Sequence, residues 1–190
     1  MDIESTLTSW SDNTWPDYSP DQILPGLFQG GTQDEEVLGF PAPAGHYARL
    51  GHRGGVTYPG YSSYPFDLVV TLYADAQPAP WGVREYRFGF PDGPIAYDDA
   101  LEAIELAQLA HRAWSKGRSV LIRCQAGVNR SGLVSALVLM LAGYRAEEAI
   151  ALLRQRRSPV VLSNRHFERW LLTEAADLLP TPSHPSGQAA

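Results

Sequence analysis

The chain is almost without cysteine. Its 190 residues contain a single one, Cys124. One cysteine excludes an internal disulfide and any metal site built on several thiolates. A small secreted domain held together by disulfides is therefore excluded as well, and the fold has to be stabilised by an ordinary apolar core. Apolar residues make up 44% of the chain and charged residues 19%, a composition typical of a folded globular protein.

Basic charge is also scarce. Fifteen Lys and Arg stand against 21 Asp and Glu, which gives a formal net charge of −6. An acidic surface repels a phosphate backbone, so nucleic acid is not an expected partner. No apolar run approaches the roughly 20 residues that a membrane span requires, and the acidic start Met1–Glu4 does not resemble a signal peptide. We expect a soluble cytoplasmic protein with no membrane partner.

The distribution of turn-forming residues predicts one folded domain. Residues 1–22 are polar and rich in turn formers, and we interpret them as a loose lead-in. Residues 23–179 then form a single domain, followed by a Pro- and Ser-rich tail at 180–190. Within the domain, residues 31–66 carry many Gly, Pro and Tyr without a sustained period, which indicates a long surface excursion.

Hydrophobic periodicity predicts strands that alternate with helices. Four short apolar or alternating segments are typical of strands, at 23–29, 67–73, 84–90 and 119–122. The first is expected at a sheet edge, because Pro25 cannot donate to a neighbouring strand. Four segments with helical spacing follow or interleave, at 98–116, 131–141, 146–156 and 164–179. This order favours an α/β fold.

The most informative segment runs from the last strand into the buried helix at 131–141. Cys124 follows the strand, Gly127 lies in the middle of a short loop, and Arg130 stands six residues after the cysteine. Backbone N–H groups of such a loop, together with a helix N-terminus, form a concave anion site. The planar guanidinium of Arg130 can hold two oxygens of one phosphate. The same positive field favours a thiolate at Cys124, which would then be a nucleophile.

A lone cysteine at a strand end is more often a buried apolar residue than a nucleophile. Here the strand, the glycine-centred loop, the Arg–Ser pair and the following helix occur together, and the combination favours catalysis. The segment Cys124-Gln125-Ala126-Gly127-Val128-Asn129-Arg130-Ser131 resembles the Cys-x5-Arg-Ser/Thr signature of protein tyrosine phosphatases, most closely that of the dual-specificity subgroup. The resemblance extends from about residue 23 to about residue 172.

This resemblance implies a three-layer α/β fold with a mostly parallel central sheet flanked by helices. It also implies phosphoryl transfer in two steps, without a metal or other cofactor, through a cysteinyl-phosphate intermediate. Residues 125–130 would bind the substrate phosphate, and Cys124 and Arg130 would be catalytic. Ser131 would donate a hydrogen bond to the sulfur, or alternatively only cap the helix. The expected substrates are phosphotyrosine or phosphoserine/threonine in proteins.

One position departs from the family pattern. The residue before the nucleophile is usually His, and here it is Arg123. Arginine keeps a positive charge here, but its reach and its hydrogen-bond geometry differ from those of histidine. We therefore expect the substitution to affect the catalytic rate more than the assignment as a phosphatase.

A general acid is needed to protonate the leaving oxygen. Family logic places an Asp on a loop a few dozen residues before the cysteine, and Asp92 in Phe90-Pro91-Asp92-Gly93-Pro94 fits this description. The alternative is a plain turn aspartate, which the Asp-Gly pair favours. Asp98 and Asp99 compete with Asp92, but acidic residues are common in the first turn of a helix for electrostatic reasons.

Three other functions stay open at this stage. Arg123 leaves room for a pseudophosphatase that binds phosphate without turnover. The same chemistry could act on a small-molecule or lipid phosphate, although residues 125–129 supply no extra cation for a highly charged substrate. Sulfur transfer of the rhodanese kind also uses a loop cysteine, but an Arg–Ser pair opening a buried helix favours phosphate.

Overall fold

The computed structural model describes residues 15–16, 18–32, 65–79 and 82–180. Five strands form one sheet in the order β1-β2-β5-β3-β4. β2 (Leu27–Gly30), β5 (Val120–Arg123), β3 (Leu68–Thr71) and β4 (Arg84–Arg87) run parallel to their neighbours, and only β1 (Asp21–Leu24) is antiparallel. The predicted α/β class with a mostly parallel sheet is confirmed.

The first predicted strand is wrong as a single element. Residues 23–29 contribute to two strands, β1 and β2, which form an antiparallel hairpin around Pro25 and Gly26. Gly26 has a φ of 81°, a conformation that suits glycine in a tight turn. Pro25 therefore lies in the turn rather than at an edge strand, and its carbonyl accepts a hydrogen bond from the Trp114 indole at 2.8 Å. β2 thereby becomes an inner strand beside β5.

Helices follow closely where the apolar period predicted them. They comprise α2 (Tyr97–Trp114), α3 (Arg130–Leu141), α4 (Ala146–Arg156), α5 (Arg165–Thr173) and α6 (Ala175–Leu178). The predicted helix at 164–179 is divided, because α5 ends at Thr173 and a new turn starts after Glu174. Asn164 caps α5 by accepting a hydrogen bond from the backbone amide of His166.

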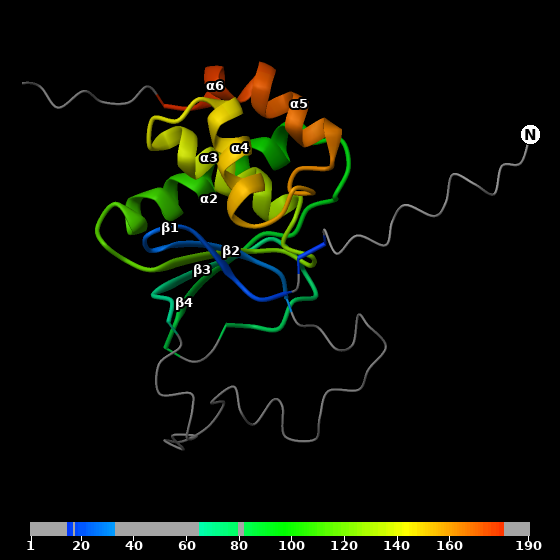
Figure 1. Ribbon diagram of the computed structural model, residues 1–190. Coiled ribbons are helices and arrows are strands. Elements are labelled where there is room, and N and C mark those ends of the chain that lie inside the picture. The colour runs from blue at the N-terminus through cyan, green and yellow to red at the C-terminus, as the bar shows by residue number, and fades with distance from the viewer. Residues whose placement is uncertain (1–14, 17, 33–64, 80–81, 181–190) are drawn as a thin grey trace, which may run out of the picture.

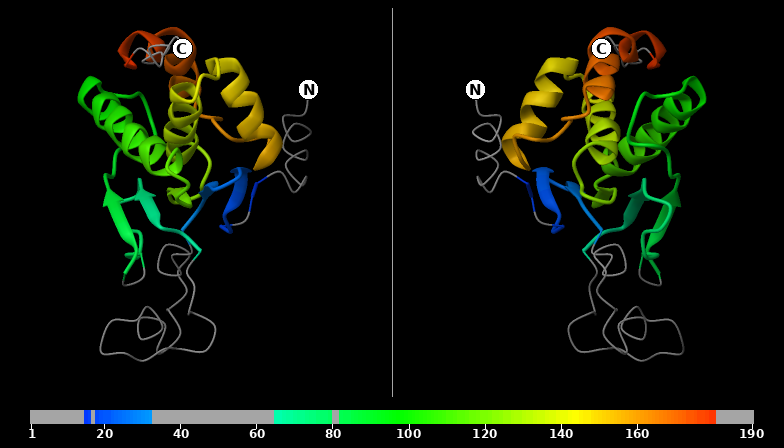
Figure 2. Two further views of the ribbon diagram at one scale, coloured as in Figure 1. Left: turned by 90° about the vertical axis from the view of Figure 1, so that its left-hand side faces the viewer. Right: turned by 90° about the vertical axis from the view of Figure 1, so that its right-hand side faces the viewer.

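The described helices α2 to α6 lie on one side of the sheet, as Figures 1 and 2 show. α3 is buried over most of its length and packs against α2, α4 and α5. Its apolar residues join the main core with the side chains of β3 and β5 that face the helices. A smaller apolar cluster of Phe66, Val69 and Leu121 lies on the other face of the sheet. The described residues place no helix on that face, so the third layer stays a prediction.

Two predicted segments lie largely outside the described residues. The lead-in is described only at 15–16 and 18–22, and the surface excursion only at its ends, 31–32 and 65–66. In the tail, only Pro180 is described. No described helix is long and apolar enough to span a membrane.

The sheet positions the informative segment at its centre. β5 is flanked by β2 and β3, and Cys124 follows its last residue directly. Crossovers in parallel sheets leave the carboxyl ends of the strands free to hold ligands. The chain turns there into α3, whose N-terminus faces the same edge. The Cys124–Arg130 loop thus occupies the middle of the sheet's carboxyl edge.

Arg123, the residue that departs from the family pattern, is held by the neighbouring strands. Its guanidinium donates to Thr71 Oγ1 at 2.9 Å and forms an ion pair with Glu85 at 3.1 Å. Glu85 also accepts from the Thr71 hydroxyl at 2.6 Å and from the Ala79 amide at 3.0 Å, and it pairs with Arg87. This polar cluster joins β3, β4 and β5 near their carboxyl ends, and Arg123 is part of the sheet rather than of an open pocket.

Glu85 is expected to make the stability of the protein depend on pH. Burial alone would raise the pKa of Glu85, but the hydrogen bonds from Thr71 and Ala79 and the charges of Arg123 and Arg87 outweigh burial, so the pKa lies below its usual value. A carboxylate with a lowered folded-state pKa stabilises the fold above its unfolded pKa, and this contribution is lost as pH falls through the folded pKa.

We predict that Glu85→Gln lowers the free energy of unfolding by about 1–3 kcal/mol at pH 7, because two arginines lose a buried charged partner. Urea unfolding measured from pH 7 downward should show the difference from wild type shrinking below pH 4.5, the ordinary pKa of a glutamate. Glu102→Gln is the matched control, since Glu102 is an exposed carboxylate on α2 without an ion pair among the described residues. A difference between Glu85→Gln and wild type that does not change with pH would contradict this role.

Candidate active site

The Cys124–Arg130 loop has an uneven hydrogen-bond pattern. The backbone carbonyls of residues 125–129 each accept a hydrogen bond. Their donors, in the same order, are Thr32, Arg157, Gln29, Leu162 and Leu133. The backbone N–H groups of residues 125–130 donate to none of the described residues. Buried backbone donors are almost always paired in folded proteins. A run of donors without a protein acceptor therefore marks a binding surface for an anion.

Gly127 lies at the tightest point of this loop. Its φ of 69° is in the left-handed region that favours glycine. A Cβ at this position would collide with the Gly30 backbone and the Arg157 guanidinium. The glycine that the sequence analysis placed at the centre of the loop is thus required both by backbone conformation and by the lack of space behind it.

Two buried side chains hold the loop from behind. Gln29 of β2 is fully buried and donates to Gly127 O at 3.0 Å. Arg157, whose side chain has no solvent exposure, donates to the same carbonyl and to Ala126 O at 3.3 Å. Because both donors approach from outside the loop, they turn these carbonyls away from the concave side. The adjoining amides are then directed the opposite way.

Arg157 also connects the loop to the start of the described chain. It donates to Ser19 O at 2.9 Å and pairs with the Asp21 carboxylate at 2.8 Å. Sequence reasoning missed this residue. It follows the helix 146–156 in a run of arginines, where a solvated side chain is the ordinary interpretation. No pattern in the sequence distinguishes the buried Arg157 from its exposed neighbour Arg156.

Cys124 is buried and lies at the floor of the loop. It is 2% exposed, and its amide donates to Gly30 O at 3.3 Å. Its thiol donates to Ser131 Oγ at 3.3 Å, which joins the start of the loop to the first turn of α3. Ser131 is fully buried, so its hydroxyl faces the sulfur and not the solvent. A hydroxyl in this position can stabilise negative charge on sulfur.

Arg130 extends from the N-terminus of α3 beside the loop. Its guanidinium carbon lies 5.2 Å from the centre of the Tyr73 ring, and Nη1 donates to Phe90 O at 3.3 Å. Its Nε is buried and has no hydrogen-bond partner among the described residues. Leaving a buried charged donor unpaired costs free energy. This orphaned donor and the unpartnered loop amides together indicate a site for an oxyanion.

Asp92 is bound to the same loop through two amides. Its carboxylate accepts from Asn129 Nδ2 at 3.0 Å and from Asn164 Nδ2 at 2.8 Å. The Asn164 side chain also donates to Gly93 O at 3.1 Å. The backbone N–H of Asn164 donates to Asn129 Oδ1 at 3.0 Å. The two asparagines thus fix the exposed Asp92 and its neighbour Gly93 against the phosphate-binding candidate residues. Asp98 and Asp99, the competing candidates, lie in the first turn of α2 instead.

All the site residues expected from sequence meet in one place, except that the side chain of Arg123 is directed to its partners on β3 and β4. The described residues contain no cluster of three or more His, Cys, Asp or Glu that could hold a metal ion. The surface excursion predicted at 31–66 also contains four basic or imidazole side chains, which lie outside the described residues: His46, Arg49, His52 and Arg53.

Part of the chain is similar to known phosphatases. Residues 100–176 match the family model of the dual specificity phosphatase catalytic domain. The chain is 28% identical over 126 residues to “Putative tyrosine phosphatase 123R” of Invertebrate iridescent virus 6, covering 58% of this chain and 81% of the viral protein. It is 41% identical over 81 residues to dual specificity protein phosphatase 5 of Rattus norvegicus, covering 40% of this chain and 21% of the rat protein.

The fold agrees with these matches. The crystal structure of human DUSP28 superimposes with a TM-score of 0.57 at 22% identity, covering 84% of this chain and 93% of that one. The matched residues 100–176 include Cys124–Ser131, and the described residues share the fold of the dual-specificity phosphatase structures. These findings support a cysteine-dependent phosphatase. The family match contains Cys124–Ser131 but not Asp92, so the role of Asp92 depends on its contacts.

We predict that Arg157→Met lowers the free energy of unfolding by about 3 kcal/mol. The change removes the buried partner of the Asp21 carboxylate and of four backbone carbonyls, those of residues 19, 29, 126 and 127. Phosphatase turnover should fall by about 10²-fold, the usual cost of losing one oxyanion donor. Chemical denaturation and turnover of p-nitrophenyl phosphate at a temperature where the variant is folded measure the two effects separately.

Arg156→Met is the matched control, because Arg156 is exposed and adjacent. Arg157→Lys, which keeps the charge but loses the fork of donors, should be intermediate. Folded Arg157→Met protein that binds tungstate and turns over substrate as wild type does would contradict this role. The hydrogen bonds from Arg157 to the loop carbonyls would then not be what orients the loop amides.

Proposed function

We propose that Cys124 is the nucleophile of a phosphatase that removes phosphate from phosphotyrosine and phosphoserine/threonine side chains of proteins. The observation that carries the proposal is the set of unpartnered donors around the Cys124 sulfur, namely the amides of residues 125–130 and Arg130 Nε. A phosphoryl group has three oxygens to accept from these donors. Its phosphorus would then lie above the sulfur, in line for attack.

In the first step the thiolate donates its electron pair to phosphorus, and the bond from phosphorus to the leaving oxygen breaks. Asp92 gives its proton to that oxygen, so the product leaves as an alcohol or phenol. Arg130 and the loop amides hold the equatorial oxygens throughout. No metal is needed, because the charge on the phosphoryl oxygens is met by these donors.

In the second step a water molecule attacks phosphorus and gives its proton to Asp92. The bond between phosphorus and sulfur breaks, and inorganic phosphate is released. Ser131 donates to the sulfur as the electron pair returns to it, which makes Cys124 a better leaving group. The 3.3 Å contact between Ser131 Oγ and Cys124 Sγ supports this role.

A single phosphate on a protein fits the site better than a highly charged ligand. Gln125, Ala126, Val128 and Asn129 carry no charge. Arg123 and Arg157, the other cations near the loop, are paired with Glu85 and Asp21 and are not available to a second phosphate. These features favour a phosphoprotein over an inositol polyphosphate or a phosphoinositide, and a panel of both substrate types distinguishes them.

A nucleophilic thiol has to stay reduced, which supports action in the cytoplasm. Residues 23–179 would form the single phosphatase domain. The described hairpin shows β1 starting at Asp21, two residues before that predicted boundary.

We predict that Cys124→Ser abolishes turnover of p-nitrophenyl phosphate and of phosphopeptides while tungstate binding is retained, because the loop amides and Arg130 stay in place. Steady-state kinetics and isothermal titration with tungstate measure the two properties. Cys124→Ser protein that hydrolyses substrate as fast as wild type would exclude the cysteine as nucleophile. Wild-type protein that binds tungstate tightly but turns nothing over would identify a phosphate reader instead.

We predict that Asp92→Asn lowers kcat by 10²–10⁴-fold, the usual contribution of a general acid. The loss should be largest for phosphoserine, whose alkoxide is a poor leaving group, and smaller for p-nitrophenyl phosphate. Asp98→Asn is the control, since it removes an exposed acid from α2 without touching the loop. Equal rates for Asp92→Asn and wild type on phosphoserine peptides would show that another group donates the proton.

A further inference from the structure

The guanidinium of Arg130 is held by two neighbours that the reaction itself does not use. Its carbon lies 5.2 Å from the centre of the Tyr73 ring, and Nη1 donates to Phe90 O at 3.3 Å. Nε is buried and has no hydrogen-bond partner among the described residues. The N–H groups of Nε and Nη2 lie along one edge of a guanidinium, and such an edge matches two oxygens of a phosphate. The ring and the carbonyl therefore leave this edge for the anion.

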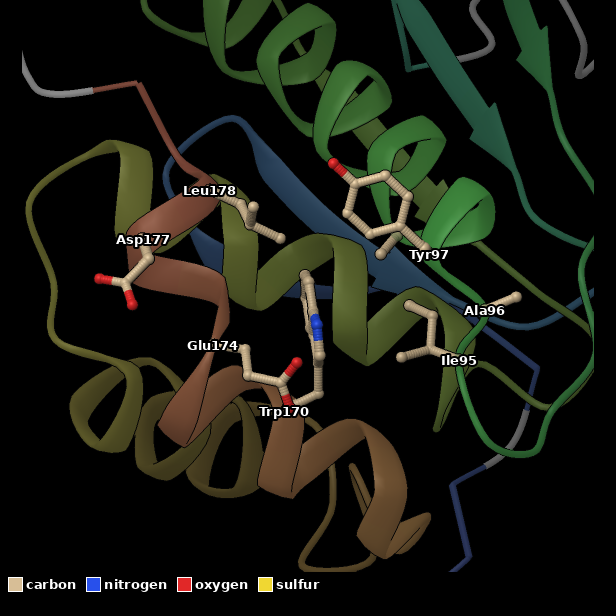
Figure 3. Close-up of a pocket in the computed structure, with 8 residues that line it drawn as sticks. Ile95, Ala96, Tyr97, Trp170, Glu174, Asp177 and Leu178 are labelled. Atoms are coloured by element: carbon tan, nitrogen blue, oxygen red, sulfur yellow. The ribbon is translucent and has the colours of Figure 1, made fainter.

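The Phe90 carbonyl is fixed by apolar packing on the helix side. The Phe90 side chain is buried, and the centre of its ring lies 6.0 Å from that of Phe167 on α5. Further along the same segment, Ile95 and Trp170 line one hollow between the start of α2 and the α5–α6 segment, as Figure 3 shows. One of the two neighbours of Arg130 is thus positioned by the helices.

Tyr73 is positioned by the sheet instead. It begins the connection 73–79, which follows β3 at the carboxyl edge of the sheet. Charged side chains from β4 and β5 bond to four backbone groups of this connection at 2.5 to 3.0 Å. Arg87 donates to the carbonyls of residues 74 and 76, Arg123 donates to that of residue 77, and Glu85 accepts from the amide of residue 79. The place of the Tyr73 ring therefore depends on this polar cluster.

The two segments that hold Arg130 also contact each other. A Cβ at Gly89 would lie 3.0 Å from the Cβ of Ala74 and 3.0 Å from its backbone nitrogen, so the chains approach as closely as a glycine permits. Gly89 directly precedes Phe90, and Ala74 directly follows Tyr73. A shift of either segment would thus move the other neighbour of the guanidinium as well.

Arg123 can hold this arrangement because its guanidinium offers five N–H donors. It donates to Thr71 Oγ1 at 2.9 Å, to Gln77 O at 2.5 Å and to Glu85 at 3.1 Å. Two of these partners are on β3 and β4, and the third is on the connection that carries Tyr73. Histidine, which the phosphatase signature usually has before the cysteine, has two ring nitrogens and a shorter reach, so it could not form all three contacts.

We propose that Tyr73 is a positioning residue for Arg130, and that Arg123 acts on the same arginine by holding the connection 73–79. An aromatic face attracts a guanidinium, and the attraction is strongest where water is excluded. The ring thereby favours the side-chain conformation of Arg130 in which Nε stays buried beside the phosphate-binding candidate loop. The inference rests on the part of the proposed function that gives Arg130 the phosphate, and it adds the residues that fix the arginine there.

Tungstate binding to the full chain tests the proposal without requiring turnover. Tyr73→Leu keeps an apolar side chain but removes the ring, and it should weaken tungstate binding by about 5- to 30-fold, the range for losing a desolvated cation–π contact. Tyr73→Phe keeps the ring and should stay within about twofold of wild type. Isothermal titration measures the affinity, and urea unfolding shows whether each variant is folded at the temperature used.

A double-mutant cycle separates positioning of the arginine from a general change in structure. Arg130→Met removes the guanidinium, and in that background Tyr73→Leu should weaken tungstate binding by no more than about twofold. Arg123→His should weaken binding by about 3- to 10-fold in the wild-type background and by no more than about twofold when residue 73 is already Leu. The rise in melting temperature with added tungstate reports the weaker affinities of these variants.

The matched controls are Tyr97→Leu and Arg118→His. Tyr97 is an exposed tyrosine of α2, and Arg118 is an exposed arginine whose ion pair is with Asp67. Neither contacts Arg130 or the connection 73–79 through a hydrogen bond, ion pair or ring contact of the described residues. Both variants should bind tungstate as wild type does.

Three outcomes would overturn the proposal. Folded Tyr73→Leu protein could bind tungstate as tightly as wild type. Tyr73→Phe could lose as much affinity as Tyr73→Leu, which would identify the hydroxyl and not the ring. The full effect of Tyr73→Leu could persist in the Arg130→Met background, which would mean that it acts through the structure as a whole. Wild-type protein that shows this dependence on Tyr73 but hydrolyses no phosphomonoester would instead retain the positioning role and remove only the proposed function.

Discussion

The rest of the site depends on the hydrogen bonds that hold the loop carbonyls from outside the loop, which we call the outward capture of the carbonyls. A peptide unit has one donor and one acceptor pointing in opposite directions, so fixing one fixes the other. Thr32, Gln29, Arg157 and Leu162 take the carbonyls of residues 125–128 from outside the loop. The adjoining amides are left facing the sulfur and Arg130. An anion can then bind without any rearrangement of the backbone, which is the physical meaning of a preorganised site.

That capture explains several sequence features at once. Gly127 is needed because its carbonyl accepts two buried donors and no Cβ fits beside Gly30. Gln29 is a fully buried polar residue of β2, and its donation to Gly127 accounts for its place in the core. The Pro25–Gly26 turn brings β2 beside β5, which is what places Gln29 behind the loop. The hairpin is thus part of the site as well as of the sheet.

Much of the fold could be predicted, because periodicity and glycine positions decide helix and strand locations. α4 begins and ends where its apolar spacing predicted, and the helix before β5 ends near Gly117, which has a φ of 77°. The hairpin was missed because Leu-Pro-Gly-Leu was interpreted as one damaged strand, although Pro-Gly is also a turn signal. The end of α5 at Thr173 was missed because no glycine or proline marks it.

Some residues of the candidate site could likewise be predicted from the sequence, and others could not. Cys124, Arg130 and Ser131 could be located because their spacing is local and their motif is short. Asp92 is 37 residues from Asn129 and 72 from Asn164, and only the structure shows that the three side chains form one hydrogen-bonded group. Arg157 could not be found at all, since its partners lie 30 to 138 residues away in the chain. Arg123 keeps a positive charge at this position, as the sequence indicates, but in the structure its guanidinium forms an ion pair with Glu85.

The contact between Arg157 and residues 19–21 has a consequence for the order in which the molecule becomes competent. The Cys-x5-Arg motif is synthesised before the guanidinium that supports it from behind, and that guanidinium closes on a segment laid down near the beginning of the chain. A ribosome-bound chain that has exposed only residues 1–140 would carry the motif without its support. The loop therefore gains its support from behind only when residues 19–21 and the segment after α4 come together.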